Sequence, residues 1–182
     1  VCDPQTRLWA QGRGWLQDKP ELLSPGAWSR GHGWLIRGMV DTLLYLPRDS
    51  AEYAELQGYL KELADALLAV QQPGGMWHCM LQRPPHASAP EVSGTALIAG
   101  NLALAIDAGF LPSEPYAAAA RKAFAALPAH VDAQGVIHAV CEGPGPLMEE
   151  GPWLVQSFPP GNDHGPFALF FAALGEHLLN RK

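Results

Sequence analysis

The densest group of chemically versatile side chains in this sequence lies at residues 28–34, which read WSRGHGW. The segment combines two indoles, a guanidinium and an imidazole, and burying such polar groups without partners is costly. Indole rings can stack on the apolar face of a sugar, and a guanidinium can grip a carboxylate through two parallel hydrogen bonds. The glycines between them let a backbone approach closely. The segment therefore predicts a binding site for an acidic sugar, with Trp28, Arg30 and Trp34 as its side chains.

The composition is typical of one globular domain, which we place at residues 1–182. Of the 182 residues, 48% are hydrophobic and 16% are charged. A net charge of -6 and the absence of a basic stripe argue against nucleic-acid binding, and no apolar run is long enough to cross a membrane. The widely spaced cysteines match no metal-site pattern and are expected to be reduced thiols, which favours a cytoplasmic location: Cys2, Cys79 and Cys141.

Helical patterns dominate the chain. Long amphipathic or apolar segments alternate with loops rich in glycine and proline, and only residues 136–140 have the pattern of a short strand. We therefore expect an all-α fold. The expected helices are 29–46, 50–71, 91–108, 114–127 and 164–179.

Three loops resemble one another: residues 3–9, 72–78 and 132–138. The matching residues Trp9, Trp77 and Ile137 are separated by 68 and 60 positions, and each interval holds two expected helices. A recurring unit of this kind is the signature of stacked helical hairpins. The chain therefore contains about three hairpins.

The helix that follows each repeated loop begins with polar residues and then becomes almost wholly apolar. A helix that is apolar all round is buried on all sides, whereas helices 50–71 and 114–127 carry ordinary surface charge. We expect an inner ring of buried helices whose N-termini, with their partial positive charge, meet on one face. The candidate binding side chains at that face are Arg30, Ser93, Asp163 and His164.

Each candidate also has a structural interpretation. Arg30 could cap a helix, and one of the two tryptophans could pack between helices, because a spacing of six residues places them on different faces. Glu91 and Ser93 could cap the helix that they begin. Six further residues could likewise either contact the substrate or have a purely structural role: His32, Trp77, His78, Glu142, Asp163 and His164.

Further motifs accompany the Trp-x-Arg-x-x-Gly-Trp run, at Gly75–His78, Glu91–Ala96, Cys141–Gly143 and Asn162–Leu169. Together, from about residue 3 to residue 179, they resemble the unsaturated glucuronyl and rhamnogalacturonyl hydrolases of glycoside hydrolase families 88 and 105. The resemblance implies an (α/α)6 barrel of six helical hairpins, a helical-hairpin toroid of which this chain supplies the C-terminal portion.

The resemblance also implies a reaction, namely hydration of the C4–C5 double bond of an unsaturated uronic acid at a non-reducing end. Such substrates arise when polysaccharide lyases act on pectin or glycosaminoglycans, and no metal or organic cofactor is expected. The family's catalytic aspartate lies upstream of the Trp-Arg-Trp segment, so no catalytic residue is assigned here. Gln11 stands where the family usually has a histidine, and Asp163 and Glu91 are the only local candidates for a replacement acid.

Three hypotheses follow from these observations. The chain could be an enzyme fragment that lacks its acid and pairs across its open edge with a missing N-terminal half or with another copy. It could instead be a non-catalytic module that binds acidic sugars or a protein partner. A lyase or epimerase of the same architecture is less favoured, because the tyrosines that could act as bases fall within helices, at Tyr45, Tyr53, Tyr59 and Tyr116.

Overall fold

The computed structural model describes residues 2–143 and 163–181. Five α-helices lie within them, together with two short 3-10 helices, η1 (Pro85–Ala87) and η2 (Leu127–His130). The all-α prediction is confirmed, and each α-helix falls within two residues of its expected bounds. The helices are α1 (Ser29–Tyr45), α2 (Ala51–Val70), α3 (Val92–Asp107), α4 (Tyr116–Ala126) and α5 (His164–Asn180).

The strand expected at residues 136–140 is wrong. Pairing there is limited to an isolated bridge between Val131 and Ile137. Ala139 adopts a φ of 57°, in the left-handed region, and this conformation interrupts an extended backbone. The segment instead passes the start of α3, where the Ala139 carbonyl accepts from the Val92 N–H at 2.9 Å.

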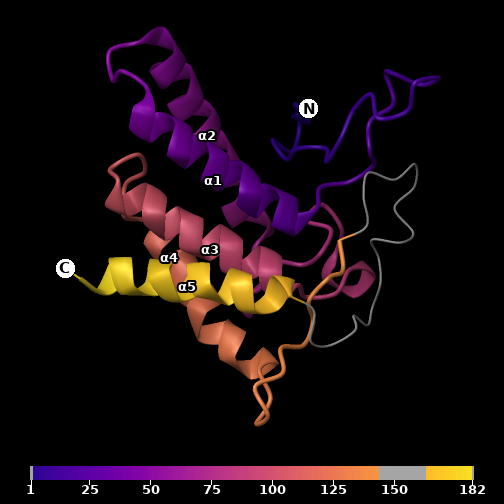
Figure 1. Cartoon of the computed structure of the whole chain (residues 1–182), viewed down its shortest axis with the longest axis vertical. Helices are drawn as coiled ribbons and strands as arrows, with labels where there is room; N and C mark the ends of the chain where they lie inside the picture. Colours follow the sequence, from indigo (N-terminus) through magenta and orange to yellow (C-terminus); the bar gives the residue numbers. More distant parts are fainter. Residues whose placement is uncertain (1, 144–162, 182) are drawn as a thin grey trace.

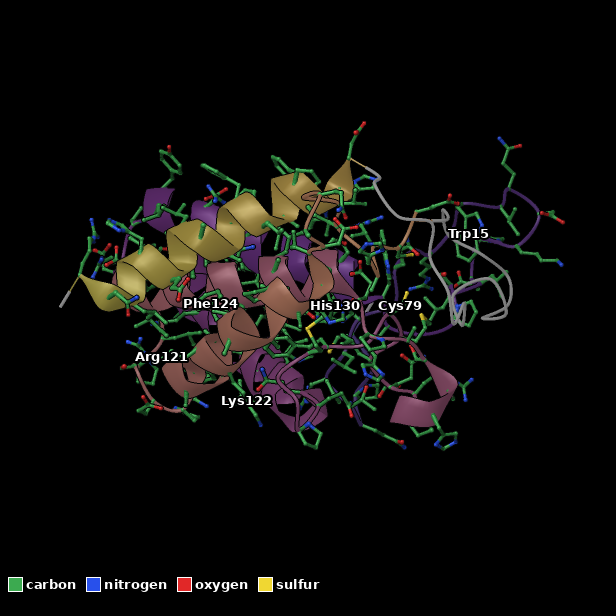
Figure 2. All side chains as sticks on the ribbon, turned by 90° about the horizontal axis from the view of Figure 1, so that it is seen from below. Trp15, Cys79, Arg121, Lys122, Phe124 and His130 are labelled. Carbon is green, nitrogen blue, oxygen red and sulfur yellow. The ribbon has the colours of Figure 1, made fainter. Side chains whose placement is uncertain are left out.

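The helices form the two expected layers. Figure 1 shows α1, α3 and α5 side by side and running in the same direction, with the N-termini of all three at one end of the molecule. In Figure 2, α4, which carries the labelled Phe124, lies beneath α5. The central helix α3 is buried at every position except Leu104 and Asp107. The predicted division into an inner and an outer layer is confirmed, but burial on all sides holds for α3 and not for α1 or α5, each of which leaves one flank exposed.

Glycines let the inner helices approach one another closely. A Cβ atom added to Gly175 of α5 would lie 2.7 Å from the Cα atom of Gly100 on α3. A Cβ atom added to Gly33 of α1 would lie 2.5 Å from the Cβ atom of Leu97 on the other flank of α3. Such separations leave no room for a side chain, so these glycines fix how the inner layer packs.

The repeated loops share one turn. The N–H of the first residue donates to the carbonyl of the last at 2.8 Å in loop 3–8, 3.0 Å in loop 72–76 and 3.0 Å in loop 132–136. Each turn also has a residue with positive φ near its end: Arg7, Gly75 and Gly135. The repeat read from the sequence is thus a repeat in backbone structure, and it places the starts of successive inner helices at the same end of the molecule.

Large apolar side chains remain exposed along the inner layer. Trp34 on α1 is 42% exposed and stacks on Phe167 of α5, with 5.7 Å between ring centroids. In the part of the chain described, no helix is long and apolar enough to span a membrane. The exposed apolar residues on α1 and α5 are Trp34, Leu44, Tyr45, Phe167, Phe170 and Leu174, and we call them the open inner face.

Candidate functional site

Arg30, the second residue of α1, lies at the end of the molecule where the inner helices begin. Its side chain is only 3% exposed, and its Cζ atom lies 4.5 Å from the ring centroid of Trp28. Nη1 donates to Ser93 Oγ at 3.1 Å and to the carbonyl of Cys141 at 2.6 Å. Burial lowers the pKa of the guanidinium, and the nearby Glu91 carboxylate opposes that shift. Arginine remains protonated in proteins, so the site contains a fixed, buried cation.

Glu91 is the N-cap of α3, and its side chain is fully buried. Oε1 accepts from the Ser93 N–H at 3.1 Å, the Ser93 hydroxyl at 2.6 Å and the Cys141 N–H at 3.1 Å. Oε2 accepts from the Gly94 N–H and from Ser29 Oγ, the latter at 3.4 Å. The capping interpretation of Glu91 is confirmed. A carboxylate enclosed by five donors is not placed to protonate a substrate, so Glu91 does not replace the missing acid.

Ser93 is also fully buried. Its hydroxyl donates to Glu91 and accepts from Arg30, which places it behind the guanidinium. Gly143, with a φ of 81°, packs directly against the Arg30 guanidinium, and a Cβ atom there would collide with it. The Cys141–Gly143 motif therefore supplies one backbone acceptor for Arg30 and a residue small enough to lie beside it.

His32 has the structural role that the sequence left open. Its Nδ1–H donates to the Trp28 carbonyl at 2.7 Å, and its Nε2 accepts from the Trp9 N–H at 2.9 Å. Burial lowers the pKa of His32 to about 4, so the imidazole is neutral at pH 7. The ring thereby joins the first repeated loop to the beginning of α1.

The two tryptophans of the segment face different surroundings. Trp28 is half-buried and lines a cavity of about 290 Å3, together with Trp9 and Gln11. The Oε1 atom of Gln11 is buried there without a hydrogen-bond partner among the residues that the structure describes. Trp34 lies on the open inner face instead, against Phe167.

Asp163 and His164 lie at the start of α5, and both are exposed. Asp163 occupies the N-cap position of α5 but makes no side-chain capping bond. Gly165 packs against Ile137 of the third repeated loop, which sets the beginning of α5 beside that loop. Asn162, the first residue of this motif, lies outside the described residues.

Of the remaining candidates, Trp77 and His78 are buried and Glu142 is exposed. Trp77 is fully buried, and its Nε1–H donates to the Leu67 carbonyl at 2.8 Å, which confirms its interpretation as repeat architecture. His78 is also buried, and burial lowers its pKa. Glu142 is exposed beside the Arg30 network.

Two cysteines pack against this network. Cys79, labelled in Figure 2, lies in the part of the molecule where α5 begins, and its carbonyl accepts from the Ser29 N–H at 2.9 Å. A hydrogen bond to Cys141 and burial raise the pKa of the Cys79 thiol. All three cysteines are free, and no cluster of three or more metal-ligating side chains is found among the described residues.

The backbone contribution of Cys141 and the cavity at Gln11 were not predicted as parts of the site. Two signals in the sequence pointed to them: the Cys-Glu-Gly motif, and Gln11 at the position where the family usually has a histidine. Neither signal shows which atoms meet, because each contact joins segments that are far apart in the chain.

Comparisons with known proteins agree on one family. A family model described as Glycosyl Hydrolase Family 88 matches residues 1–151. An unsaturated 3S-rhamnoglycuronyl hydrolase from Formosa agariphila is 29% identical over 133 residues, which cover 70% of this chain and 35% of that protein. An unsaturated rhamnogalacturonyl hydrolase from Bacillus subtilis is 29% identical over 141 residues, which cover 78% of this chain and 38% of that protein.

A solved structure extends the similarity to the whole chain. The crystal structure of a possible member of the GH105 family from Salmonella enterica superposes with a TM-score of 0.84 at 26% identity. The match covers 100% of this chain and 47% of that one, so this chain spans about half the length of the structure. The predicted architecture, part of an (α/α)6 barrel, is confirmed.

Proposed function

We propose that this chain, which belongs to Glycosyl Hydrolase Family 88, supplies the carboxylate-binding part of an unsaturated uronyl hydrolase. The observation that carries the proposal is Arg30, held by Ser93 and Cys141 at the N-terminal end of the inner layer and stacked on Trp28. A guanidinium fixed beside an indole offers a uronic acid both a charge partner and an apolar ring face. The N-termini of three parallel helices add a partial positive charge at the same end.

The proposed substrate is an unsaturated oligosaccharide released by a polysaccharide lyase from pectin or a glycosaminoglycan. Two relatives are named as hydrolases of unsaturated rhamnoglycuronyl and rhamnogalacturonyl compounds, which supports this class. Water adds across the C4–C5 double bond of the uronyl residue, and the product opens to release the next sugar. In this proposal Arg30 holds the uronate carboxylate, Trp28 and Trp34 contact the sugars, and Asp163 and His164 contribute from the start of α5.

The general acid is proposed to lie outside this chain. Glu91 is committed to its five donors, and Asp163 is exposed, without the burial that helps a carboxyl act as an acid. The chain spans about a third to a half of the length of the relatives described above. We propose that further hairpins cover the open inner face and bring the acid to Arg30.

The aromatic character of the open inner face supports such a partner. It exposes several aromatic side chains on neighbouring helices, including Phe170 at 65% exposure, and contiguous apolar surface of this kind marks an interaction site. The partner is a missing half of the barrel or a second copy of the chain. Sedimentation analysis of the purified chain separates a monomer from a dimer.

The test of the function uses the loss of ultraviolet absorbance that accompanies hydration of an unsaturated uronyl disaccharide. We expect the chain alone to bind this disaccharide without turning it over, and Arg30→Ala to weaken binding at least tenfold. Arg121→Ala is the control, because Arg121 lies on the outer helix α4 and donates to Asn180 at 2.8 Å. Robust turnover by the chain alone would contradict the placement of the acid.

The alternative of a non-catalytic sugar-binding module makes a different prediction. It requires the same Arg30-dependent binding but no turnover after the missing half is supplied. A rise in absorbance when intact pectin is added would instead indicate a lyase.

A further inference from the structure

The geometry points to a positioning role for Glu91 and Ser93. We propose that together they orient the Arg30 guanidinium toward the substrate carboxylate without touching the substrate themselves. This inference rests on the proposed function, in which Arg30 binds that carboxylate. Both residues are fully buried, so they can act on a ligand only through a side chain that lies between.

Glu91 determines which way the Ser93 hydroxyl proton points. A hydroxyl has one proton, and Ser93 donates it to Glu91 Oε1 at 2.6 Å. A carboxylate can only accept, so the Ser93 oxygen presents its lone pairs to Arg30 Nη1 at 3.1 Å. Without the negative charge of Glu91, the hydroxyl could turn its proton toward the guanidinium and repel it.

Glu91 also fixes the position of the Cys141 carbonyl. The same Oε1 atom of Glu91 accepts the Cys141 N–H at 3.1 Å, and the carbonyl of that residue accepts from Arg30 Nη1 at 2.6 Å. Both acceptors of Nη1 are therefore fixed by one carboxylate oxygen. The two N–H groups of Nη1 are used in this way, and the donors on Nε and Nη2 lie outside this network.

Gly143 sets the surroundings of Nη2. Gly143 approaches this atom so closely that no side chain could be accommodated there. Nη1 is held by Ser93 and the Cys141 carbonyl, which leaves Nε and Nη2 as the edge that can donate two parallel hydrogen bonds to a carboxylate. Nη1 thus binds the scaffold, and the remaining donors are available to the ligand.

Ser29 provides a matched control. Its hydroxyl is buried and donates to Glu91 Oε2 at 3.4 Å, at the start of α1. Among the described residues, its hydroxyl is not seen to bond to Arg30. Ser29→Ala and Ser93→Ala therefore each remove a buried hydroxyl from the same carboxylate, but only the second removes a contact to the guanidinium.

The first experiment needs no ligand. Nitrogen-15 NMR of the full chain measures the exchange of the Arg30 guanidinium protons with water, assigned by their loss in Arg30→Lys. We expect Ser93→Ala and Glu91→Gln to accelerate this exchange at least tenfold, Ser93→Thr to restore it, and Ser29→Ala to change it less than twofold. Equal acceleration in both alanine variants would show a general loosening of the scaffold and would overturn the proposal. Because Glu91→Gln removes a buried charge and could unfold the chain, Ser93→Ala is the decisive variant.

The second experiment measures the carboxylate preference, defined as the Kd of the methyl ester of an unsaturated uronyl disaccharide divided by the Kd of its free acid. We expect Ser93→Ala to lower this ratio at least fivefold and Ser29→Ala to leave it unchanged. A wild-type chain that prefers the acid, together with a Ser93→Ala variant that keeps the preference, would overturn this inference alone. A wild-type chain that binds acid and ester equally would overturn the proposed function and this inference with it.

Discussion

The beginnings of α3 and α5 occupy equivalent places in the repeat, yet they are built differently. The N-cap of α3, Glu91, is fully buried and accepts five hydrogen bonds from three segments of the chain. The N-cap of α5, Asp163, is exposed and makes no capping bond. The difference shows that the junction between α1 and α3 is complete within this chain, whereas α5 lies at an edge of the inner layer.

Removing the two cap carboxylates gives the largest expected contrast. Glu91→Ala leaves Arg30 buried without its compensating charge, and we expect it to lower the free energy of unfolding by about 3–5 kcal/mol. Asp163→Ala removes an exposed side chain with no capping bond, and we expect a change within about 0.5 kcal/mol. Urea unfolding followed by circular dichroism measures both. Similar losses in the two variants would contradict the contrast between the two helix starts.

The α1–α3 junction should also be sensitive to pH through His32. Its pKa is about 4 in the folded chain against an ordinary value of 6.5, because burial disfavours the imidazolium. Between these values the unfolded chain binds a proton that the folded chain does not, so stability falls as the pH decreases from 6.5 to 4. The contribution is fully present above pH 6.5, and the loss amounts to about 3 kcal/mol.

The measurement compares urea unfolding of the wild-type chain and of His32→Gln across this range. We expect the variant to lose the contribution of His32, since Gln does not titrate, and to keep the smaller one that comes from His78 and His130, whose pKa values burial also lowers. His164→Gln serves as the control, because His164 is exposed at the start of α5. A His32→Gln variant that retains the full wild-type slope would exclude His32 as its source.

Substituting two glycines with positive φ distinguishes the effect of backbone strain from the effect of a contact with Arg30. Gly143→Ala both strains the backbone and pushes a methyl group into the guanidinium, whereas Gly135→Ala strains the backbone at a position with nothing within 4 Å. We expect each to lower stability by about 1–2 kcal/mol, but only Gly143→Ala to weaken binding of the unsaturated uronyl disaccharide, by about tenfold. Calorimetric titration measures the binding, and equal affinities in the two variants would argue against the close approach at Gly143.

The last comparison concerns the open inner face. Trp34 is partly exposed and stacks on Phe167, so Trp34→Ala should cost about 1 kcal/mol through the loss of an aromatic pair. The same substitution should reduce any self-association through the open inner face, which sedimentation measures. A cost above about 3 kcal/mol would mean that Trp34 behaves as a core residue despite its exposure.

Local patterns in the sequence were sufficient for the helices and their layers. The apolar run of α3 and the charged surface of α2 distinguish an inner from an outer helix. This distinction can be made from the sequence of each helix alone. The repeat was also readable, since the turns at residues 72–76 and 132–136 use similar residues. The strand predicted at 136–140 failed because the positive φ of Ala139 is not specified by any neighbour in the sequence.

The network around Arg30 could not be predicted in the same way. The sequence identified Arg30 as a candidate and offered capping as an interpretation of Glu91, but the two hydrogen bonds of Nη1 join residues 63 and 111 positions apart. Nor does the sequence show that His32 donates to one backbone group and accepts from another. These roles depend on how the hairpins stack, which no single segment encodes.

The claim that Arg30 binds a uronate carboxylate is tested most directly by the carboxylate preference of Arg30→Ala. Binding of an unsaturated uronyl disaccharide and of its methyl ester is measured by calorimetry for the wild-type chain and for this variant. The account predicts that the wild-type chain binds the free acid at least tenfold more tightly than the ester, and that Arg30→Ala binds both with equal, weak affinity. An Arg30→Ala variant that keeps the wild-type preference for the acid would contradict it.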